Sequence, residues 1–314
     1  MTDPHVVLRS LGEVAHIRTL RRHGVADADL RAQVRSGRLR RLRIGWYASR
    51  FADADQIAAV SLGGRLGCVT ALGRMGVWSG ADAALHVHFE PNRSGPPQVP
   101  DASRESSAPA VAHPRTLDDR RVVARLSDPR VPPRSHWRPE PEPDAALDWV
   151  VLPAGALAEA LRCQPVEHAQ AVVDTIVGAG MLTRGQVQRI VEGAPDRVGI
   201  VVDELSGCVG SGAESFGLRR LRAAGHEVRP QFQLAGHGRF DSLVDGCVLF
   251  EVDGWEFHRT REQFILDRER TLIAQSFGLP VVRAAATKVM RDWPTVLDAV
   301  ERAVSDARAL GRHR

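Results

Sequence analysis

The run Cys247–Val252 constrains the fold of this chain more than any other segment, because five of its six residues are apolar. A short, nearly continuous apolar run between turn signals is typical of a strand that is buried within a sheet. Its charged residue is Glu251, and Asp253 follows two positions later. A carboxylate inside a buried strand is costly without a cation, so the run indicates both a central strand and a site.

The segments around this run alternate between helical and strand patterns. Helices are predicted over residues 211–224, 260–277 and 292–304, and strands over residues 227–234, 239–244, 247–252 and 280–284. This order, α-β-β-β-α-β-α, is similar to the core of the PD-(D/E)XK nucleases.

The register of the two middle strands decides whether their acidic residues meet. A two-residue turn, Asp245-Gly246, would place Asp241 opposite Phe250. A three-residue loop that includes Cys247 instead places Asp241 opposite Glu251. Sorting by polarity favours this second register. It gathers on one face Phe240, Val244, Val248, Phe250 and Val252, and on the other Arg239, Asp241, Leu243, Leu249, Glu251 and Asp253.

The carboxylates of this segment are candidate ligands for a divalent cation. Hydrolysis of a phosphodiester needs charge neutralisation and an activated water, which Mg²⁺ supplies while bound to oxygen ligands. Asp241 and Glu251 are the first candidates. Glu214 is a third, although three residues after Ser211 it also fits a capping box. Asp253 is a fourth, although Asp253-Gly254 also fits a turn that ends the strand.

Beyond the apolar strand the chain carries a series of motifs: Asp253-Gly254, then His258, then Asp267-Arg268, then Gly278 followed by Val281 and Arg283. Together they resemble the Vsr-like (very-short-patch-repair) domain of the PD-(D/E)XK superfamily, over about residues 211–304. The resemblance implies an endonuclease site that uses Mg²⁺ or Mn²⁺. In that site Asp241 would anchor the metal, the strand end with Glu251, Val252 and Asp253 would complete its shell, and His258 would transfer a proton or orient a phosphate.

Each of these assignments has a simpler alternative. His258 fits an ordinary histidine at a strand end. Arg268, a candidate phosphate contact, also fits pairing with acids one helical turn away. Asp253 stands where the general nuclease class has a lysine. Vsr-like members also lack that lysine, so the departure leaves open whether this copy is catalytically competent.

The N-terminus is strongly basic. Residues 1–50 hold eleven arginines against four acidic residues, an excess of +7, while the rest of the chain carries −3. Such a local excess indicates contact with nucleic acid. Lys288 is the only lysine in the chain, so a genome that favours arginine codons is the alternative explanation. It does not explain why acidic residues are scarce in the same segment.

Three short helices and a basic hairpin are predicted between residues 4 and 48, with Asp27 as the cap of the third helix. This is the order of a winged helix-turn-helix. The positions of Gly37, Leu39, Leu42, Gly45 and Tyr47 resemble the wing of AbiEi-type antitoxins, which implies DNA binding. The alternative is a basic helical module that packs on its neighbour. The candidate DNA contacts are Arg31, Arg35, Arg38, Arg40, Arg41 and Arg43.

The middle of the chain has mixed character. Residues 52–80 and 153–206 show helical periodicity, and Leu85–Phe89 fits a strand. Twelve of the nineteen prolines lie between Pro91 and Pro143, so that stretch is predicted to be mostly loop or flexible insertion. Two short apolar runs, Val122–Leu126 and Leu147–Leu152, are candidate strands. Cys68, Cys163, Cys208 and Cys247 form no CxxC pair, so they indicate small core residues rather than a zinc site or disulfide framework.

These patterns predict a multidomain α/β (α+β) protein. Its parts are a winged helix at 1–50, an AbiEi-antitoxin-like mixed region at 51–206 with a proline-rich insertion at about 91–145, and a Vsr-like domain at 207–314. The absence of an apolar run near the ~20 residues of a membrane span indicates a cytoplasmic protein without membrane contact. The expected function is a metal-dependent DNA endonuclease or nicking enzyme. The alternative is a non-catalytic DNA-binding regulator or type IV antitoxin-like protein. DNA is the expected partner, and a cognate toxin or a homo-oligomer is left open.

Overall fold

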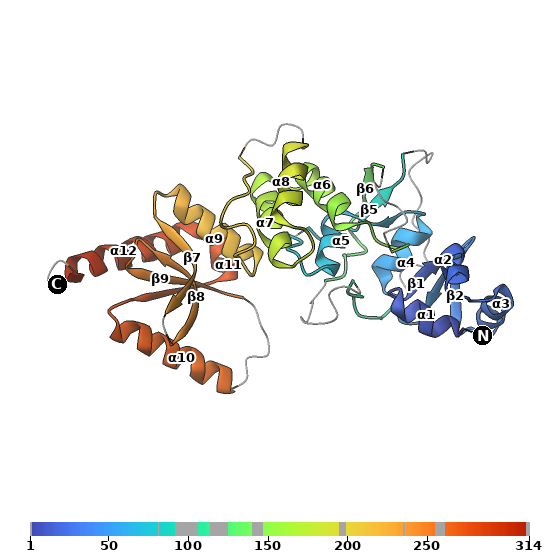
Figure 1. Cartoon of the computed structure of the whole chain (residues 1–314), viewed down its shortest axis with the longest axis horizontal. Coiled ribbons are helices and arrows are strands. Elements are labelled where there is room, and N and C mark those ends of the chain that lie inside the picture. The colour runs from blue at the N-terminus through green and yellow to red at the C-terminus, as the bar shows by residue number, and fades with distance from the viewer. Residues whose placement is uncertain are drawn as a thin grey trace. The chain divides into compact units, whose positions relative to one another are not determined.

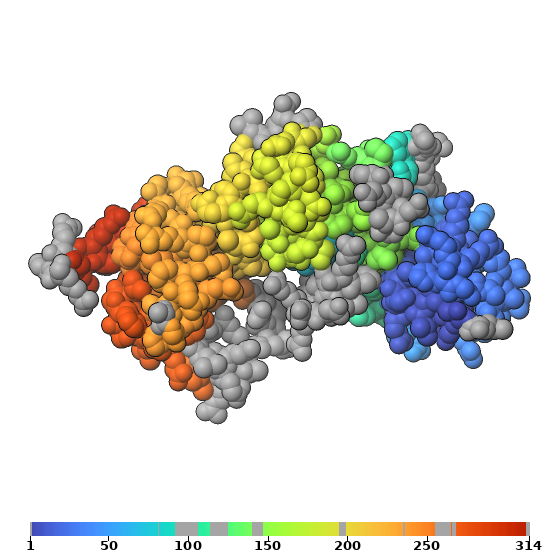
Figure 2. Space-filling model, viewed as in Figure 1, coloured from blue at the N-terminus to red at the C-terminus, as the bar shows by residue number. Residues whose placement is uncertain are grey.

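Two units make up this chain, and the computed structural model describes residues 2–80, 82–91, 106–113, 125–139, 147–194, 199–234, 236–254 and 261–311 (Figure 1). The first unit comprises Met1–Val172 and Ala179–Ile200, and the second comprises Val173–Gly178 and Val201–Arg314. Both contain helices and small sheets, so the chain is a mixed α+β protein. Within each unit the described residues are closely packed (Figure 2).

The N-terminal segment of the first unit forms a three-stranded sheet covered by three helices. Its elements are α1 (Pro4–Ser10), β1 (Val14–His16), α2 (Ile17–Arg22), α3 (Asp27–Arg35), β2 (Leu39–Arg43) and β3 (Trp46–Ser49). Strand β3 lies between β1 and β2, antiparallel to both. Leu20, Leu30 and Tyr47 are buried in its core. The three predicted helices and the hairpin are confirmed, and β1 is an additional strand.

Local chemistry explains the turns of this segment. Gly45 ends the two-residue turn after Arg43 with φ +80, and a Cβ there would lie 2.7 Å from Nε2 of His16. Only glycine combines that backbone with that close approach. The prediction for Asp27 is wrong: Ala26 is the N-cap of α3. Asp27 lies in the first turn, where it forms an ion pair with Arg21 at 2.6 Å.

The rest of the first unit surrounds a second small sheet. Its elements are α4 (Ala54–Ser61), β4 (Arg65–Leu66), α5 (Cys68–Arg74), β5 (His86–Phe89), β6 (Arg134–Trp137), α6 (Pro153–Cys163), α7 (Val166–Gly178, which continues into the second unit) and α8 (Arg184–Glu192). Strand β5 lies between β4, antiparallel to it, and β6, parallel to it. The helical predictions are confirmed.

The proline-rich stretch contains one strand that the sequence does not predict. Its described parts lack regular structure except for β6, whose residues are mostly exposed, so β6 has no alternating apolar pattern to reveal it. The predicted strand at Leu147–Leu152 is reduced to a single bridge between Leu66 and Val150. Of the other predicted strand, Val122–Ala124 lie outside the described residues, and Arg125 and Leu126 are irregular.

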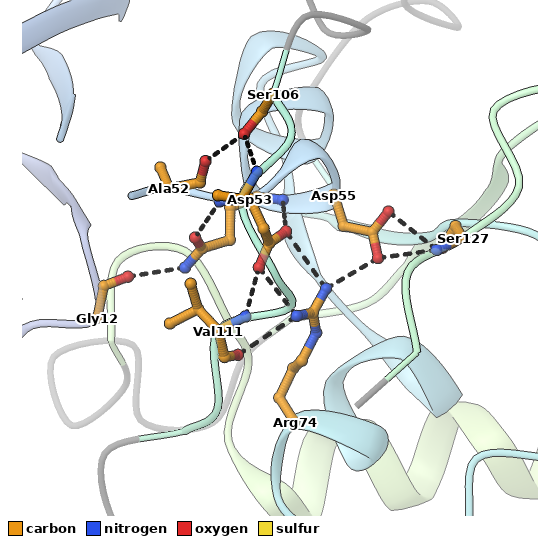
Figure 3. Close-up of polar contacts among 10 residues, drawn as sticks. Gly12, Ala52, Asp53, Asp55, Arg74, Ser106, Val111 and Ser127 are labelled. Carbon is orange, nitrogen blue, oxygen red and sulfur yellow. Dashed lines mark hydrogen bonds and ion pairs between the residues drawn. The ribbon is translucent and has the colours of Figure 1, made fainter. Parts of the chain in front are cut away.

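A buried ion-pair network holds part of this stretch against α4 and α5 (Figure 3). Arg74, which is 1% exposed, forms ion pairs with Asp53 at 2.9 Å and Asp55 at 2.8 Å. The same two carboxylates accept the backbone N–H of Val111 at 2.8 Å and of Ser127 at 3.2 Å. Two distant loop segments are therefore fixed through their main chain.

The second unit contains a four-stranded mixed sheet. Its elements are α9 (Gly212–Ala223), β7 (Val228–Leu234), β8 (Gly238–Val244), β9 (Val248–Asp253), α10 (Arg261–Ser276), β10 (Val281–Ala285), α11 (Ala286–Arg291) and α12 (Trp293–Gly311). The strand order is β10-β9-β8-β7, with β10 parallel to β9 and the other pairs antiparallel. Helices α9 and α12 cover one face and α10 the other (Figure 1). The predicted order of elements is confirmed, with α11 as an added short helix.

The side chains of this sheet lie on the predicted faces except for that of Phe240. A Cβ on Gly217 would lie 3.0 Å from the ring of Phe250, so α9 packs closely over that side of β9. Leu243 and Leu249 instead cluster with Ala274 of α10. Phe240 belongs to this second cluster, although alternation predicted it on the face of Phe250. The neighbouring strand is irregular there, since Gln231 has φ +52, and regular alternation is lost.

Among the helices of the described residues, none combines the length and apolar character needed to cross a membrane.

Candidate functional site

The strands β8 and β9 place the two principal carboxylates side by side. Their register pairs Ser242 with Phe250 and Val244 with Val248, which leaves residues 245–247 as the loop. Asp245 and Gly246 both have positive φ, as a tight loop of this length requires. The same register extended by one residue places Asp241 opposite Glu251. The predicted three-residue loop is confirmed.

Asp241 is bound to the neighbouring strand through its side chain. Oδ2 of Asp241 accepts a hydrogen bond from the backbone N–H of Val252 at 2.8 Å. Burial raises the pKa of Asp241, and the nearby charge of Asp253 acts in the same direction. Val252, which is predicted to complete the metal shell, thus contacts Asp241 directly. Asp253, the other predicted residue at this strand end, is the last residue of β9 and is half-buried.

Glu251 lies between two arginines. It is 8% exposed, and its Oε1 forms an ion pair with Arg270 at 3.0 Å and its Oε2 with Arg283 at 2.7 Å. Arg270 comes from α10 and Arg283 from β10. Burial nevertheless raises the pKa of Glu251, against the lowering effect of both guanidinium groups. Desolvation therefore outweighs the two ion pairs at this carboxylate.

Glu214 lies in the first turn of α9 and is the most strongly perturbed of the three carboxylates. Burial, with the charge of Asp241 as the next contribution, raises its pKa from 4.5 to about 7. Oγ of Ser211 accepts the backbone N–H of Glu214 at 3.2 Å, which is half of a capping box. The carboxylate itself accepts the backbone N–H of Gly210 at 2.8 Å.

The ligand atoms of the three carboxylates are of the kind that a divalent cation prefers, but their positions in this structure do not form a metal site. Their donors are all oxygens, as Mg²⁺ prefers. Oε2 of Glu251 is buried and, among the described residues, accepts no hydrogen bond of good geometry, although Arg283 lies beside it. The side chains of Asp241, Glu251 and Glu214 do not converge on one compact group of ligand atoms. Metal binding at this place requires Glu251 to exchange its arginine partners for the ion.

Two further predicted site residues are Arg268 and His258. Arg268 is exposed on α10, within two residues of Arg270. His258 lies outside the described residues. The only lysine, Lys288, lies on α11 and forms an ion pair with Asp292 at 2.6 Å.

The six arginines predicted to contact DNA in the N-terminal segment lie on α3, on β2 and on the turn that joins them. Five of the six predicted contacts are exposed and Arg40 is half-buried. Arg43 lies over the ring of Trp46, 5.9 Å from its centroid. In the described part of the chain, no carboxylate forms an ion pair with Arg35, Arg38 or Arg41. The exposed members of the predicted set are Arg31, Arg35, Arg38, Arg41 and Arg43.

The structure also assembles a cluster that the sequence analysis missed. Cys68, His86, His136 and Cys163 place one ligand atom each within 4.8 Å of one another, and no other group of three or more potential metal ligands within the described ranges is as compact. Cys68 is a buried core residue, as predicted, and Cys163 is half-buried, but the sequence does not reveal that both thiols lie beside His86 and His136. Gaps of 17 to 49 residues separate the four positions, so no short motif reveals them.

The two thiols of this cluster differ in acidity. A hydrogen bond from Cys68 lowers the pKa of Cys163, and hydrogen bonds from His136 and His86 act in the same direction. Burial raises the pKa of Cys68, which is fully buried. The cluster thus favours a thiolate at Cys163.

Comparison of the chain with models of known families, with characterised proteins and with solved structures gives no match, so the functional assignment rests on the geometry of these sites.

Proposed function

We propose that this chain is a metal-dependent DNA endonuclease of the PD-(D/E)XK type that reaches DNA through an N-terminal winged helix. The observation that carries the proposal is the register of β8 and β9 in a unit of α-β-β-β-α-β-α order: it pairs Ser242 with Phe250, so that its extension by one residue sets Asp241 opposite Glu251. Glu214, from the helix that covers the sheet, adds a third carboxylate, half-buried like Asp241, and the charge of Asp241 helps to raise its pKa.

The order of elements in the N-terminal segment supports DNA binding. The chain runs through a helix, a strand, two helices and a hairpin, and its three strands form a sheet of order β1-β3-β2. This arrangement suits a winged helix-turn-helix. The second helix of the helix-turn-helix is α3. This helix, the hairpin and the turn between them carry the exposed arginines that are predicted to contact DNA. In this proposal α3 enters the major groove, and the hairpin contacts phosphates.

Asp241, Glu251 and Glu214, with the carbonyl of Val252, would hold Mg²⁺ or Mn²⁺. The bound ion would neutralise phosphoryl charge and activate a water. Arg270 and Arg283 lie at the same carboxylate and are suited to bind the phosphate that is cleaved, since guanidinium groups bind phosphate oxygens in a bidentate manner. His258 remains the predicted proton-transfer residue.

Nicking of supercoiled plasmid with Mg²⁺ or Mn²⁺ tests this proposal. Wild-type protein should nick the plasmid, and Glu251→Gln should lose most of that activity because the isosteric amide cannot neutralise the ion. Glu227→Gln is the matched control, since Glu227 is an exposed carboxylate of the same unit that pairs only weakly with Arg229. Nicking that is absent in the wild type, or equal in wild type and Glu251→Gln, would reject the endonuclease.

The two ion pairs of Glu251 favour a second candidate, a non-catalytic DNA-binding regulator of antitoxin-like type. In that case Arg270, Glu251 and Arg283 are a structural triad that fastens α10 and β10 to β9. Salt-sensitive DNA binding without metal-dependent cleavage, together with a lower midpoint of unfolding for Glu251→Gln, would support the regulator over the nuclease.

A further inference from the structure

Four side chains from four separate elements meet in the first unit, whereas the proposed nuclease site belongs to the second. Cys68 is the first residue of α5, His86 the first of β5, His136 lies in β6, and Cys163 is the last residue of α6. Cys68 and His86 are fully buried, and His136 and Cys163 are half-buried. Two thiols and two imidazoles are the ligand set of many structural zinc sites.

Their separations suit a tetrahedral ion. Zinc bonds of the usual length place two nitrogen ligands roughly 3.3 Å apart, and a nitrogen and a sulfur roughly 3.6 Å apart. Nδ1 of His86 lies 3.0 Å from Nε2 of His136 and 3.8 Å from Sγ of Cys163. The two imidazole rings are nearly parallel, at an angle of 12° with centroids 5.3 Å apart.

A carboxylate behind His86 orients its ring. Nε2 of His86, the nitrogen that faces away from the cluster, lies 3.2 Å from Oδ2 of Asp82. Arg134 in turn lies 3.0 Å from the same oxygen. A metal-bound histidine usually donates its other ring N–H to a carboxylate, which fixes the tautomer. With Nε2 turned to Asp82, Nδ1 is the ring nitrogen directed at His136 and Cys163.

The backbone at Cys68 is also held by a dedicated partner. Cys68 has φ +46, a strained conformation for a residue other than glycine. Its backbone N–H donates to Oε2 of the buried Glu159 at 2.7 Å, and Oε1 of Glu159 lies 2.6 Å from Nδ1 of His88. This arrangement turns the Cys68 side chain toward Cys163, His86 and His136.

We propose that Cys68, His86, His136 and Cys163 bind one structural Zn²⁺ ion. Four protein ligands close the coordination shell, which is typical of structural rather than catalytic zinc. A cavity of about 360 Å³, lined in part by Asp82, Arg134 and Cys163, adjoins the cluster and gives an ion a route to it. The ion would fasten the exposed edge strand β6, which pairs only with β5 in its sheet, to α5 and α6.

Metal analysis of the full-length protein tests this inference. The result of that analysis does not depend on whether the protein cleaves DNA. Protein purified without chelator should contain one zinc ion per chain by mass spectrometry of the metal. Replacement with Co²⁺ should produce the intense d–d absorption of a tetrahedral site and a thiolate-to-cobalt charge-transfer band. Cys163→Ser should lose most of the zinc and the charge-transfer intensity, whereas Cys208→Ser and Cys247→Ser, which alter cysteines outside the cluster, should keep both.

Two further variants keep the test decisive if Cys163→Ser folds poorly. His136→Gln changes a half-buried ligand on an edge strand and should lose zinc while retaining the far-ultraviolet circular dichroism of the wild type. Asp82→Asn leaves all four ligands in place and should weaken zinc affinity by about 10–100-fold. A protein without zinc after reconstitution, a Cys68–Cys163 disulfide in its place, another metal at one per chain, or full zinc in Cys163→Ser would overturn the proposal.

Discussion

At Asp241, Glu251 and Glu214, the three carboxylates of the proposed nuclease site, burial raises the pKa and outweighs the charges that lower it. The pKa of Glu251 is raised by burial although two arginines contact it, and the pKa of Asp241 is raised although Val252 donates a hydrogen bond to it. A group of buried and half-buried acids whose ionisation is suppressed in this way is typical of functional sites. It is the residue-scale reason to place the nuclease proposal at this sheet.

Glu214 makes the stability of the protein depend on pH. Its pKa is about 7 in the folded protein and near 4.5 when unfolded, so between these values the folded state binds more protons. Its contribution to the free energy of unfolding therefore falls as pH rises through that window, by roughly 3 kcal/mol in total. Glu214→Gln keeps an oxygen acceptor for Gly210 but does not ionise.

Urea unfolding of Glu214→Gln and of wild type measures this effect without added divalent cations. The variant should gain stability relative to wild type from about pH 5 to about pH 8, because only the wild type must keep a buried proton or charge. A difference between the two proteins that stays constant over this range would contradict the assignment.

Arg74 neutralises two buried carboxylates, those of Asp53 and Asp55. Arg74→Met should lower the free energy of unfolding by about 3–5 kcal/mol, because Asp53 and Asp55 would remain buried without their cation. Chemical denaturation followed by circular dichroism measures the loss. Arg130→Met, which removes an exposed ion pair with Asp128, is the control and should leave the midpoint unchanged. A small effect at Arg74 would show that water reaches this network.

At the scale of elements, the N-terminal helices and hairpin depend on the rest of the first unit. Trp149 donates its Nε1–H to the carbonyl of Leu11 at 2.8 Å, and Asp148 accepts the backbone N–H of His16 at 2.8 Å. Gln56 donates to the carbonyl of Gly12 at 2.7 Å. Deletion of residues 1–50 would expose these partners, so point substitutions of arginine are the sharper test of DNA binding.

The double variant Arg35→Ala/Arg41→Ala should weaken DNA binding without loss of folded structure, since both side chains are exposed and carry no described ion pair. The plot of log affinity against log salt should become shallower by about 1 for each arginine that contacts a phosphate. Fluorescence anisotropy on a labelled duplex measures this slope. Arg302→Ala, which alters an exposed arginine of α12, is the control. An unchanged slope in the double variant would place the DNA contact elsewhere.

The second unit includes the end of a helix that begins in the first. The last turns of α7 provide Asp174, which is fully buried and accepts hydrogen bonds from Ser206, Ser215 and Arg219. Periodicity predicted α7 as one helix. It contains no signal that its last residues pack with α9, because that contact depends on side chains more than thirty positions away.

At the scale of the whole molecule, the chain has three groups of chemically active side chains: exposed arginines on α3 and β2, a thiol and imidazole cluster around β5, and buried or half-buried carboxylates on β8, β9 and α9. Each group suits a different ligand: the arginines suit phosphate, the thiols and imidazoles suit a borderline-soft metal such as zinc, and the carboxylates suit a hard divalent cation. The zinc and endonuclease proposals can therefore fail independently of each other.

Periodicity and turn chemistry determined most of the elements by themselves. The order of elements in the second unit follows from apolar patterns of period 2 and 3.6, and the loop at Asp245 follows from the polarity of β8 and β9, because these signals are local. Tertiary structure alone decided the arginine partners of Glu251, the face of Phe240, the strand β6 and the assembly of Cys68, His86, His136 and Cys163. These features depend on contacts between residues far apart in the chain, which local periodicity does not encode.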